Sequence, residues 1–562
     1  MIEPRRNKET PVRITRIVAC LVLAGAGAGT MRAAADDELI SQERMRQHIE
    51  FLASDDLAGR APGTPGEKTA VAYLARTLKE MGCEPGNPNG SFTQAVPLFG
   101  FTVTNAPSFD LKKTDGAAVR SLASGSEFVG WTLRQGTGTT VKDAELVFVG
   151  YGVEAPEYAW NDYKDVDVSG KIIVMLVNDP PLADSLRFGG RAMTYYGRWT
   201  YKFEKAAEKG AAGAVLVHTT SAAGYPWAVV ENSWSGEQFD VVRADLGESR
   251  CGFESWVTED AARAMFAATG RSLDAARLQA TSPDFRPYSI GLLGSVEVKL
   301  RSRTITSSNV VARLPGTDPE HADETIVYSA HWDHLGIGKA ADGDSIYNGA
   351  IDNASGVAGV LEIAHALAAR RAELRRSVLF LFTTGEESGL LGSTHYTNQP
   401  LYPLEKTIAE INVDALNVWG RTEDMIVVGF GQSDLDQMLA DANVPLQRRV
   451  APDGEPEKGY YYRSDHFPFA KKGVPALYSD SGVEHRGRPK GWGAERRREY
   501  VAQRYHKPQD EYDATWDLSG AAEDMEALFR VGYLLATTDR TPQWSAQSEF
   551  KHVRDEMLRG QE

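Results

Sequence analysis

Cysteine is scarce in this sequence, and an excess of positive charge is missing. Three cysteines among 562 residues exclude a dense disulfide framework and a cysteine-rich zinc module. The chain has 61 basic and 77 acidic residues, which gives a formal net charge of −16. Nucleic-acid binding is therefore not expected, because it requires a basic surface that displaces counterions. A hydrophobic content of 42% is enough for packed cores and excludes a disordered chain.

Three common catalytic motifs are also absent. The sequence has no H-E-x-x-H, which excludes a zinc site carried on one helix. It has no G-x-S-x-G, so the nucleophile turn of serine hydrolases is not supported. It has no phosphate-binding P-loop either. Any catalytic site must therefore be assembled from other residues.

The first 35 residues have the layout of a secretory signal peptide. The opening stretch carries five basic side chains, namely Arg5, Arg6, Lys8, Arg13 and Arg16. An apolar run at 17–26 follows, too short to span a membrane, and small residues precede Asp36, which predicts cleavage after Ala35. We therefore expect an exported chain, periplasmic or secreted, without a membrane span after cleavage. An uncleaved anchor and lipidation at Cys20 are less favoured alternatives.

Cleavage would leave two cysteines, Cys83 and Cys251. An exported protein permits a disulfide, but these residues lie in what we predict to be different domains. Two free, buried thiols are therefore favoured over a disulfide.

Changes in composition and hydrophobic pattern divide the chain into five parts. Residues 1–35 are the signal, 36–100 the N-terminal part of the main domain, 101–294 a β-rich insert, 295–541 the core of the main domain, and 542–562 a polar, peripheral tail. Amphipathic helices are predicted at 39–52 and 68–81 from their apolar spacing. The insert has short β-rich runs between Gly, Pro and Asp turns, with one clear helix-to-strand unit at 205–218.

From about Ser295, short apolar and β-branched runs alternate with helical stretches. Strands are predicted at 325–330, 377–384, 408–415, 425–430 and 475–479, and a long helix at 354–371. Buried strands that alternate with helices indicate an α/β fold, with a mostly parallel central sheet flanked by helices.

Histidines and carboxylates gather at the ends of these predicted strands and in the adjoining loops. They are His331, Asp333, His334, Asp352, Glu386, Glu387, Asp414, His506 and Asp510. In open α/β sheets, ligands bind outside the carboxyl ends of the strands. Two histidines and three carboxylates from this set suit two zinc ions, if one carboxylate bridges and each ion keeps a position for water.

The sequence resembles the co-catalytic two-zinc aminopeptidase family, which includes secreted bacterial aminopeptidases, glutamate carboxypeptidases and the transferrin receptor. The matching segments, in the family's order, are SAHWDHLG, NGAIDNASGVAGVLEIA, LFTTGEESGLLGS, INVDALN, RSDHFPFAKKGVPAL and YHKPQDEYD. The opening segment LASDDLAGRAPGTPGEKTA is also similar to this family. Within the insert, VFVGYGVEAPEY and KAAEKGAAGAVLVH resemble a protease-associated domain.

The resemblance implies a set of zinc ligands. His331 and Asp414 would bind one ion, Glu387 and His506 would bind the other, and Asp352 would bridge both.

The resemblance also implies roles around the metals. Glu386 would be the general base, and Asp333 would orient His331. Tyr505 matches a tyrosine that helps to hold the developing oxyanion, and Arg463 matches an arginine near the substrate. The family tends to have a cis peptide at the position of Asp352 and Asn353.

Other residues in these segments are expected to have structural roles. His334 is interpreted as a loop histidine, His466 as a support of the pocket, and Asp510 as a turn or supporting carboxylate.

The predicted activity is that of an exported, two-zinc aminopeptidase acting on peptides with a free N-terminus. A carboxypeptidase or dipeptidase would need a cationic pocket, which Arg463 alone does not provide. A glutaminyl cyclase would use one zinc and lack an insert. A non-catalytic, receptor-like protein would have lost metal ligands, and all five are present here.

The signal prediction can be tested directly. Protein recovered from a secreting host is expected to begin at or near Asp36, because the signal is removed after Ala35. N-terminal sequencing measures this. Intact Met1 in a soluble cytosolic fraction would contradict it.

Overall fold

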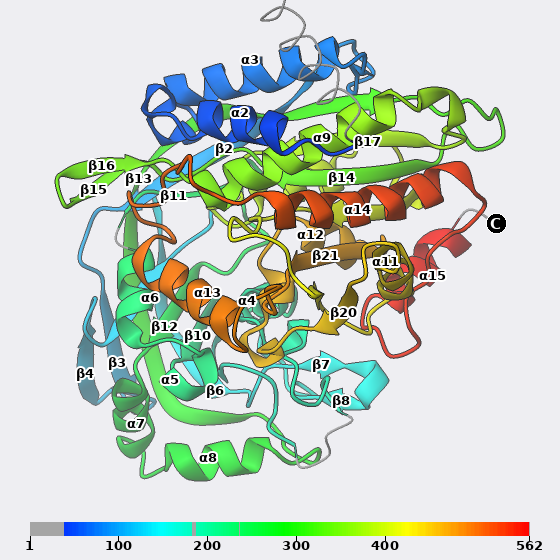
Figure 1. Cartoon of the computed structure of the whole chain (residues 1–562). Helices are drawn as coiled ribbons and strands as arrows, with labels where there is room; N and C mark the ends of the chain where they lie inside the picture. Colours follow the sequence, from blue (N-terminus) through cyan, green and yellow to red (C-terminus); the bar gives the residue numbers. More distant parts are fainter. Residues whose placement is uncertain (1–38, 183–186, 235, 561–562) are drawn as a thin grey trace, which may run out of the picture.

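Two β-sheets joined through one long strand form the frame of the chain (Figure 1). The computed structural model describes residues 39–182, 187–234 and 236–560. The predicted signal peptide lies outside these ranges. Among the helices of these ranges, none combines the length and the apolar composition that a membrane span requires.

The first sheet is the central sheet of the predicted α/β domain. Its strands run in the order β11 (Gln238–Val241), β2 (Thr93–Val103), β13 (Tyr288–Leu314), β17 (Ser377–Thr383), β14 (Thr325–His331), β18 (Thr407–Asn412), β21 (Ala476–Ser481), β19 (Asp424–Val428) and β20 (Arg449–Pro452). The middle strands β17, β14, β18 and β21 are parallel, and antiparallel strands flank them. This confirms the predicted fold class.

Helices cover both faces of this sheet. On one face lie α2 (Gln42–Leu52), α9 (Gly356–Ala368), α11 (Leu435–Asn443) and α14 (Ser519–Thr537). On the other lie α10 (Leu391–Asn398) and α12 (His466–Lys471). In β17, Phe380 packs on the first face and the neighbouring Leu379 and Leu381 pack on the second. Successive side chains of a strand point to opposite faces, so the central strands read as continuous apolar runs.

Helix α3 (Pro65–Glu80) begins three residues before its predicted start. The side chain of Thr64 accepts a hydrogen bond from the backbone of Glu67 and caps the helix. Pro65 occupies the first turn, where no backbone donor is needed. The turn-rich composition of this segment therefore concealed a well-capped helix start.

The second sheet lies within the predicted insert. It contains β4 (Ala118–Ala123), β3 (Ser108–Lys113), the first part of β13, β6 (Gly138–Phe148), β9 (Ile172–Leu176), β10 (Gly213–Val217), β12 (Phe253–Val257) and β5 (Phe128–Trp131). Helices α4 (Trp199–Glu208), α7 (Glu259–Ala267) and α8 (Leu273–Ala280) belong to the same stretch. The stretch is therefore more helical than predicted, and its boundaries and its likeness to a protease-associated domain remain predictions.

Strand β13 has 27 residues and belongs to both sheets. Its first half pairs with β3 and β6, and its second half pairs with β2 and β17. Loops of the two regions are also in contact, because the Tyr462 hydroxyl donates to the Met193 carbonyl at 3.1 Å. The Met193 amide donates to the Pro456 carbonyl at the same distance.

The two cysteines follow the favoured prediction. Cys83 and Cys251 are both free and buried. Burial raises the pKa of the Cys83 thiol to about 12.

The C-terminal segment is not peripheral, contrary to the prediction. Trp544 and Phe550 are buried, and α15 (Lys551–Arg559) follows them. The guanidinium of Arg554 donates to the carbonyls of Leu404 and Thr407, each at 3.1 Å. The polar composition hid a few apolar anchors and one arginine that satisfies buried backbone groups.

Burial in α9 provides a test of the packing. The Val360 side chain is 0% exposed, whereas Val444, at the end of α11, is 69% exposed. Val360→Ala should lower the free energy of unfolding by about 1.5–3 kcal/mol, because it removes buried methyl groups. Val444→Ala should change it by less than about 0.5 kcal/mol. Urea titration followed by tryptophan fluorescence measures both, and equal effects would contradict the assigned core.

Candidate metal centre

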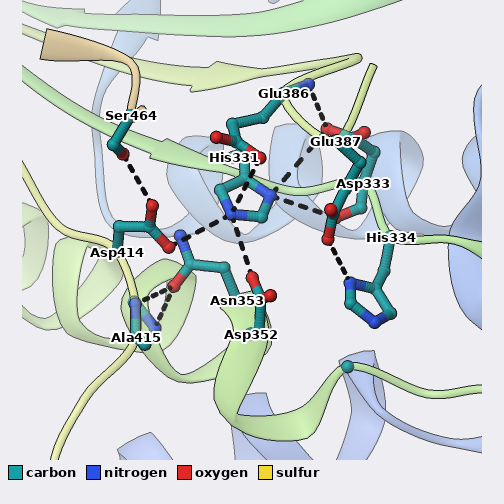
Figure 2. A network of polar contacts seen from close by, with 12 residues as sticks. His331, Asp333, His334, Asp352, Asn353, Glu386, Glu387, Asp414, Ala415 and Ser464 are labelled. Atoms are coloured by element: carbon teal, nitrogen blue, oxygen red, sulfur yellow. Dashed lines mark hydrogen bonds and ion pairs between the residues drawn. The ribbon is translucent and has the colours of Figure 1, made fainter. Parts of the chain in front are cut away.

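The predicted ligands meet at the carboxyl ends of the parallel strands. His331 is the last residue of β14 and pairs in register with Thr383 of β17. Glu386 and Glu387 follow β17, and Asp414 follows β18. Asp352 lies in the short helical segment Ala350–Ser355 that leads into α9. Figure 2 shows these side chains pointing toward one another.

His331 stands at the centre of a first group of ligands. Its Nε2 atom lies 3.3 Å from Oδ1 of Asp352 and 3.3 Å from Oδ1 of Asp414. The hydroxyl of Ser464 donates to the other oxygen of Asp414 at 2.6 Å, which fixes the orientation of that carboxylate. His331 itself is buried.

A second group forms around His506. Its Nε2 atom lies 3.3 Å from Oδ2 of Asp352 and 3.1 Å from Oε2 of Glu387. Asp352 therefore directs one oxygen toward each histidine. The structure brings all five predicted ligands together in two groups that share this carboxylate.

The spacing within both groups fits zinc. Two ligand atoms of one tetrahedral zinc, each about 2.0–2.1 Å from the ion, lie about 3.3–3.4 Å apart. The four distances from the histidines to the carboxylates are between 3.1 and 3.3 Å. The donors are imidazole nitrogen and carboxylate oxygen, the ligands zinc prefers among those present. In addition, Oε1 of Glu387 is buried and makes no regular hydrogen bond, although Nδ1 of His334 lies 2.5 Å from it.

The carboxylates change the protonation of the histidines. Burial would lower the pKa of His331, but Glu386 and Asp414 outweigh it and hold the pKa well above the usual range. Burial would also lower the pKa of His506, but the negative charge of Glu387 outweighs this effect and raises the pKa well above its usual value. The centre therefore favours positive charge, whether from protons or from metal ions.

Two side chains hold the loop of Asp352 in place. Asn353 donates to the Val413 carbonyl at 3.0 Å and accepts from the Ala415 amide at 2.9 Å, which ties this loop to that of Asp414. Asp510 accepts the backbone amide of Asp352 at 3.1 Å, in keeping with a supporting role. The peptide between Asp352 and Asn353 is cis, as predicted.

Asp333 supports the site in a way that differs in detail from the prediction. Nδ1 of His331 contacts the backbone carbonyl of Asp333 at 3.1 Å, whereas the Asp333 carboxylate is 4.0 Å away. That carboxylate instead accepts the backbone amide of Glu386 at 3.2 Å. It therefore anchors the chain of Glu386 more directly than it orients the histidine.

Arg60 is a functional residue that the motif analysis did not single out. Its guanidinium is buried and donates to the carbonyls of Leu52, Trp332, Asn348 and Gly349. Burial lowers the pKa of Arg60 to about 10, so the group stays charged at neutral pH. It joins the loop after β14 to the loop before Asp352. The sequence offered one indication of this role, namely that Arg60 is a charged residue within the opening segment that resembles the family.

Tyr505 and Arg463 lie beside the ligands, at a cavity of about 360 Å³. The cavity is also lined by Asp352, Glu386 and Asp414. The ring of Tyr505 stacks on that of His506, with centroids 3.9 Å apart. The guanidinium of Arg463 donates to the Lys458 carbonyl at 2.6 Å.

His334 and His466 have different surroundings. His466 is buried, and its ring stacks, with centroids 4.7 Å apart, on Tyr478, which lines the cavity. His334 was predicted to be a structural loop histidine, but it lies against one of the predicted ligands. Its Nδ1 atom is 2.5 Å from Oε1 of Glu387.

The fold and the site together define an α/β protein with a histidine–carboxylate metal centre at the ends of its parallel strands. Residues 309–529 match the model of peptidase family M28. Over this stretch the chain is similar to peptidase family M28, in agreement with the family resemblance. The match does not extend to residues 101–294.

Curated relatives match the chain over part of their length. Aminopeptidase NAALADL1 of Mus musculus is 36% identical over 140 residues, which cover 24% of this chain and 17% of that protein. Leupeptin-inactivating enzyme 1 of Streptomyces exfoliatus is 27% identical over 208 residues, covering 35% of this chain and 42% of that protein. The matches thus span less than half of either relative.

Solved structures match over most of the chain at lower identity. The aminopeptidase from Aneurinibacillus sp. strain AM-1 is 20% identical, with a TM-score of 0.46, and the match covers 89% of this chain and 95% of that one. BSAP, a zinc aminopeptidase from Bacillus subtilis, is 17% identical, with a TM-score of 0.40, covering 91% and 97%.

Proposed function

We propose that the protein is an exported, two-zinc aminopeptidase that removes residues from peptides with a free N-terminus. One observation carries the proposal. Asp352 directs its two oxygens toward two separate histidine–carboxylate groups, and the cavity beside them is lined by a carboxylate, Glu386, that belongs to neither pair.

The residues of the centre would divide the metals between them. His331 and Asp414 would hold one zinc ion, Glu387 and His506 the other, and Asp352 both. When bound, the ions would act as Lewis acids and make water a better nucleophile at neutral pH.

Glu386 would move the proton. Its carboxylate lines the cavity, so it can take a proton from water as the water attacks the scissile carbonyl, and then pass it to the leaving amine. Burial raises the pKa of Glu386 well above its ordinary value, against the opposing effect of His331. Additional positive charge beside it would favour the ionised form that a base requires.

The polar lining of the cavity favours an aminopeptidase over a carboxypeptidase or dipeptidase. Of the two arginines at the cavity, Arg497 is paired with Asp480 and Arg463 donates to a backbone carbonyl. Neither forms a free cationic pocket for a substrate carboxylate. The carboxylates of Asp352, Glu386 and Asp414, which also line the cavity, suit the ammonium group of a free N-terminus instead. The name of the relative aminopeptidase NAALADL1 points the same way.

A substrate panel tests this choice. Aminoacyl-anilides should be hydrolysed, whereas N-blocked peptides and substrates reporting C-terminal cleavage should not. Preferential hydrolysis of N-blocked peptides from the C-terminus would replace the proposal with the carboxypeptidase alternative.

The stretch 101–294 would shape the entrance of the cavity. Its Met193 contacts Tyr462, which directly precedes the cavity residue Arg463. We infer a role in peptide access rather than in metal binding, because all five proposed ligands lie outside this stretch.

Two adjacent glutamates allow the base to be separated from a ligand. Glu386→Gln should keep close to two zinc ions per chain and lose at least about 10²-fold in turnover, because an amide cannot accept the proton. Glu387→Gln should lower zinc content as well as turnover, since a neutral ligand binds zinc more weakly. Metal analysis and anilide hydrolysis measure both. A near-normal rate for Glu386→Gln would refute the mechanism.

The shared carboxylate gives a second test. Asp352→Ala should reduce zinc content more than Asp414→Ala, because Asp352 faces both histidines and Asp414 faces only His331. Zinc per chain after dialysis against buffer is the measurement. Equal losses from the two variants would contradict the bridging role.

A further inference from the structure

His334 is buried beside the second ligand group, although nothing in the proposed mechanism uses it. It lies three residues after His331, in the loop that leaves β14, and is 1% exposed. Figure 2 shows its ring turned toward Glu387. A buried imidazole pressed against a proposed metal ligand requires an explanation.

The two oxygens of Glu387 face different histidines. Oε2 lies 3.1 Å from Nε2 of His506, and Oε1 lies 2.5 Å from Nδ1 of His334. Among the described residues, Oε1 of Glu387 has no other hydrogen-bond partner, and neither does Nδ1 of His334. The final torsion of a glutamate is broad, so a carboxylate held at one oxygen can still turn. A contact at the second oxygen fixes its plane.

The distances separate a ligand from a positioning residue. Ligand atoms that share one zinc ion lie about 3.3–3.4 Å apart, which matches the contacts of His506 with Glu387 and Asp352. The contact of His334 with Glu387 is shorter, at 2.5 Å, which is closer to hydrogen-bond distance than to the spacing of two ligands on one zinc ion. His334 is therefore placed to hold the ligand rather than the ion.

The surroundings of His334 fix its ring. Gly349 has a φ of +56°, and a Cβ atom built there would lie 2.5 Å from Cγ of His334, so a side chain at this position would collide with the ring. Arg60 restricts the motion of this loop, because its guanidinium donates hydrogen bonds to the carbonyls of Asn348 and Gly349. The ring thus has a firm wall behind it and the Glu387 carboxylate in front.

We propose that His334 is a positioning residue of the metal centre, which donates a hydrogen bond from Nδ1 to Oε1 of Glu387 and so keeps Oε2 directed at the second metal. The proposal rests on zinc binding by the site, as in the proposed function. The supporting partners of metal ligands commonly contribute 10- to 100-fold, roughly, to metal affinity.

Three substitutions in the full-length chain test the role. Asparagine carries its amide nitrogen on Cγ, where Nδ1 is attached, whereas glutamine reaches the position of Nε2. His334→Ala and His334→Gln should weaken binding at the second site by about 10- to 100-fold, and His334→Asn should restore most of the affinity. Titration of the metal-free proteins with zinc alone, against a fluorescent chelator, measures this without any substrate.

A matched control separates local from general effects. His218 is also buried, but it lies in the second sheet region and contacts the Tyr225 carbonyl. His218→Ala should leave zinc affinity unchanged. Circular dichroism of each metal-free variant establishes folding, and if His334→Ala does not fold, the comparison of Asn with Gln decides alone.

The possible results are distinct. Wild-type affinity in all three His334 variants would overturn the proposal and leave the proposed function standing. Equal weakening by Asn and Ala would also overturn it, since the ring would then be a ligand that an amide cannot replace. A chain that binds zinc as expected but cleaves no aminoacyl substrate would refute the proposed function and leave the positioning role.

Discussion

Repulsion among buried carboxylates is the constraint on which this site depends. Like charges about 4 Å apart repel by about 4 kcal/mol at the effective dielectric constant near protein surfaces. Asp333, Asp352 and Glu387 are nevertheless buried within one small volume. In the structure, His331 and His506 stand between them, and Arg60 lies behind. Zinc ions would replace the imidazolium protons with stronger positive charge, so the same electrostatic demand explains both the raised histidine pKa values and the fit to metal.

The fold meets this constraint by fixing loops rather than strands. Parallel strands end together, which brings the loops after β14, β17 and β18 to one edge. Their positions are then set by hydrogen bonds between loops. Asn353 joins the Asp352 and Asp414 loops, and Arg60 joins two loops on the other side. Every such bond satisfies backbone groups that burial would otherwise leave without partners.

Residues at strand ends could be predicted from the sequence, whereas the contacts between distant segments could not. The apolar runs predicted the parallel strands, and the histidine and carboxylates at their ends predicted that His331, Glu387 and Asp414 lie at one edge of the sheet. The contact of Arg60 with Trp332 joins segments 272 residues apart and has no local pattern. The same holds for His334, whose role depends on the direction of Glu387. The C-terminal segment was misjudged because its few apolar anchors are separated by polar residues.

Adjacent glutamates can have different roles here because their surroundings differ. Both lie in the turn after β17, where the amides of Gly389 and Leu390 donate to the Glu386 carbonyl. Glu387 turns inward, and each of its oxygens meets an imidazole, which is the environment of a ligand. Glu386 is held through its backbone amide by Asp333, so its position is fixed while its carboxylate remains at the cavity. A base needs a fixed position and a carboxylate that faces the substrate; Oε2 of Glu386 lies 3.9 Å from Nε2 of His331, farther than the proposed ligand oxygens. Asp333 therefore contributes to the proposed chemistry by holding the chain of Glu386 without occupying its carboxylate.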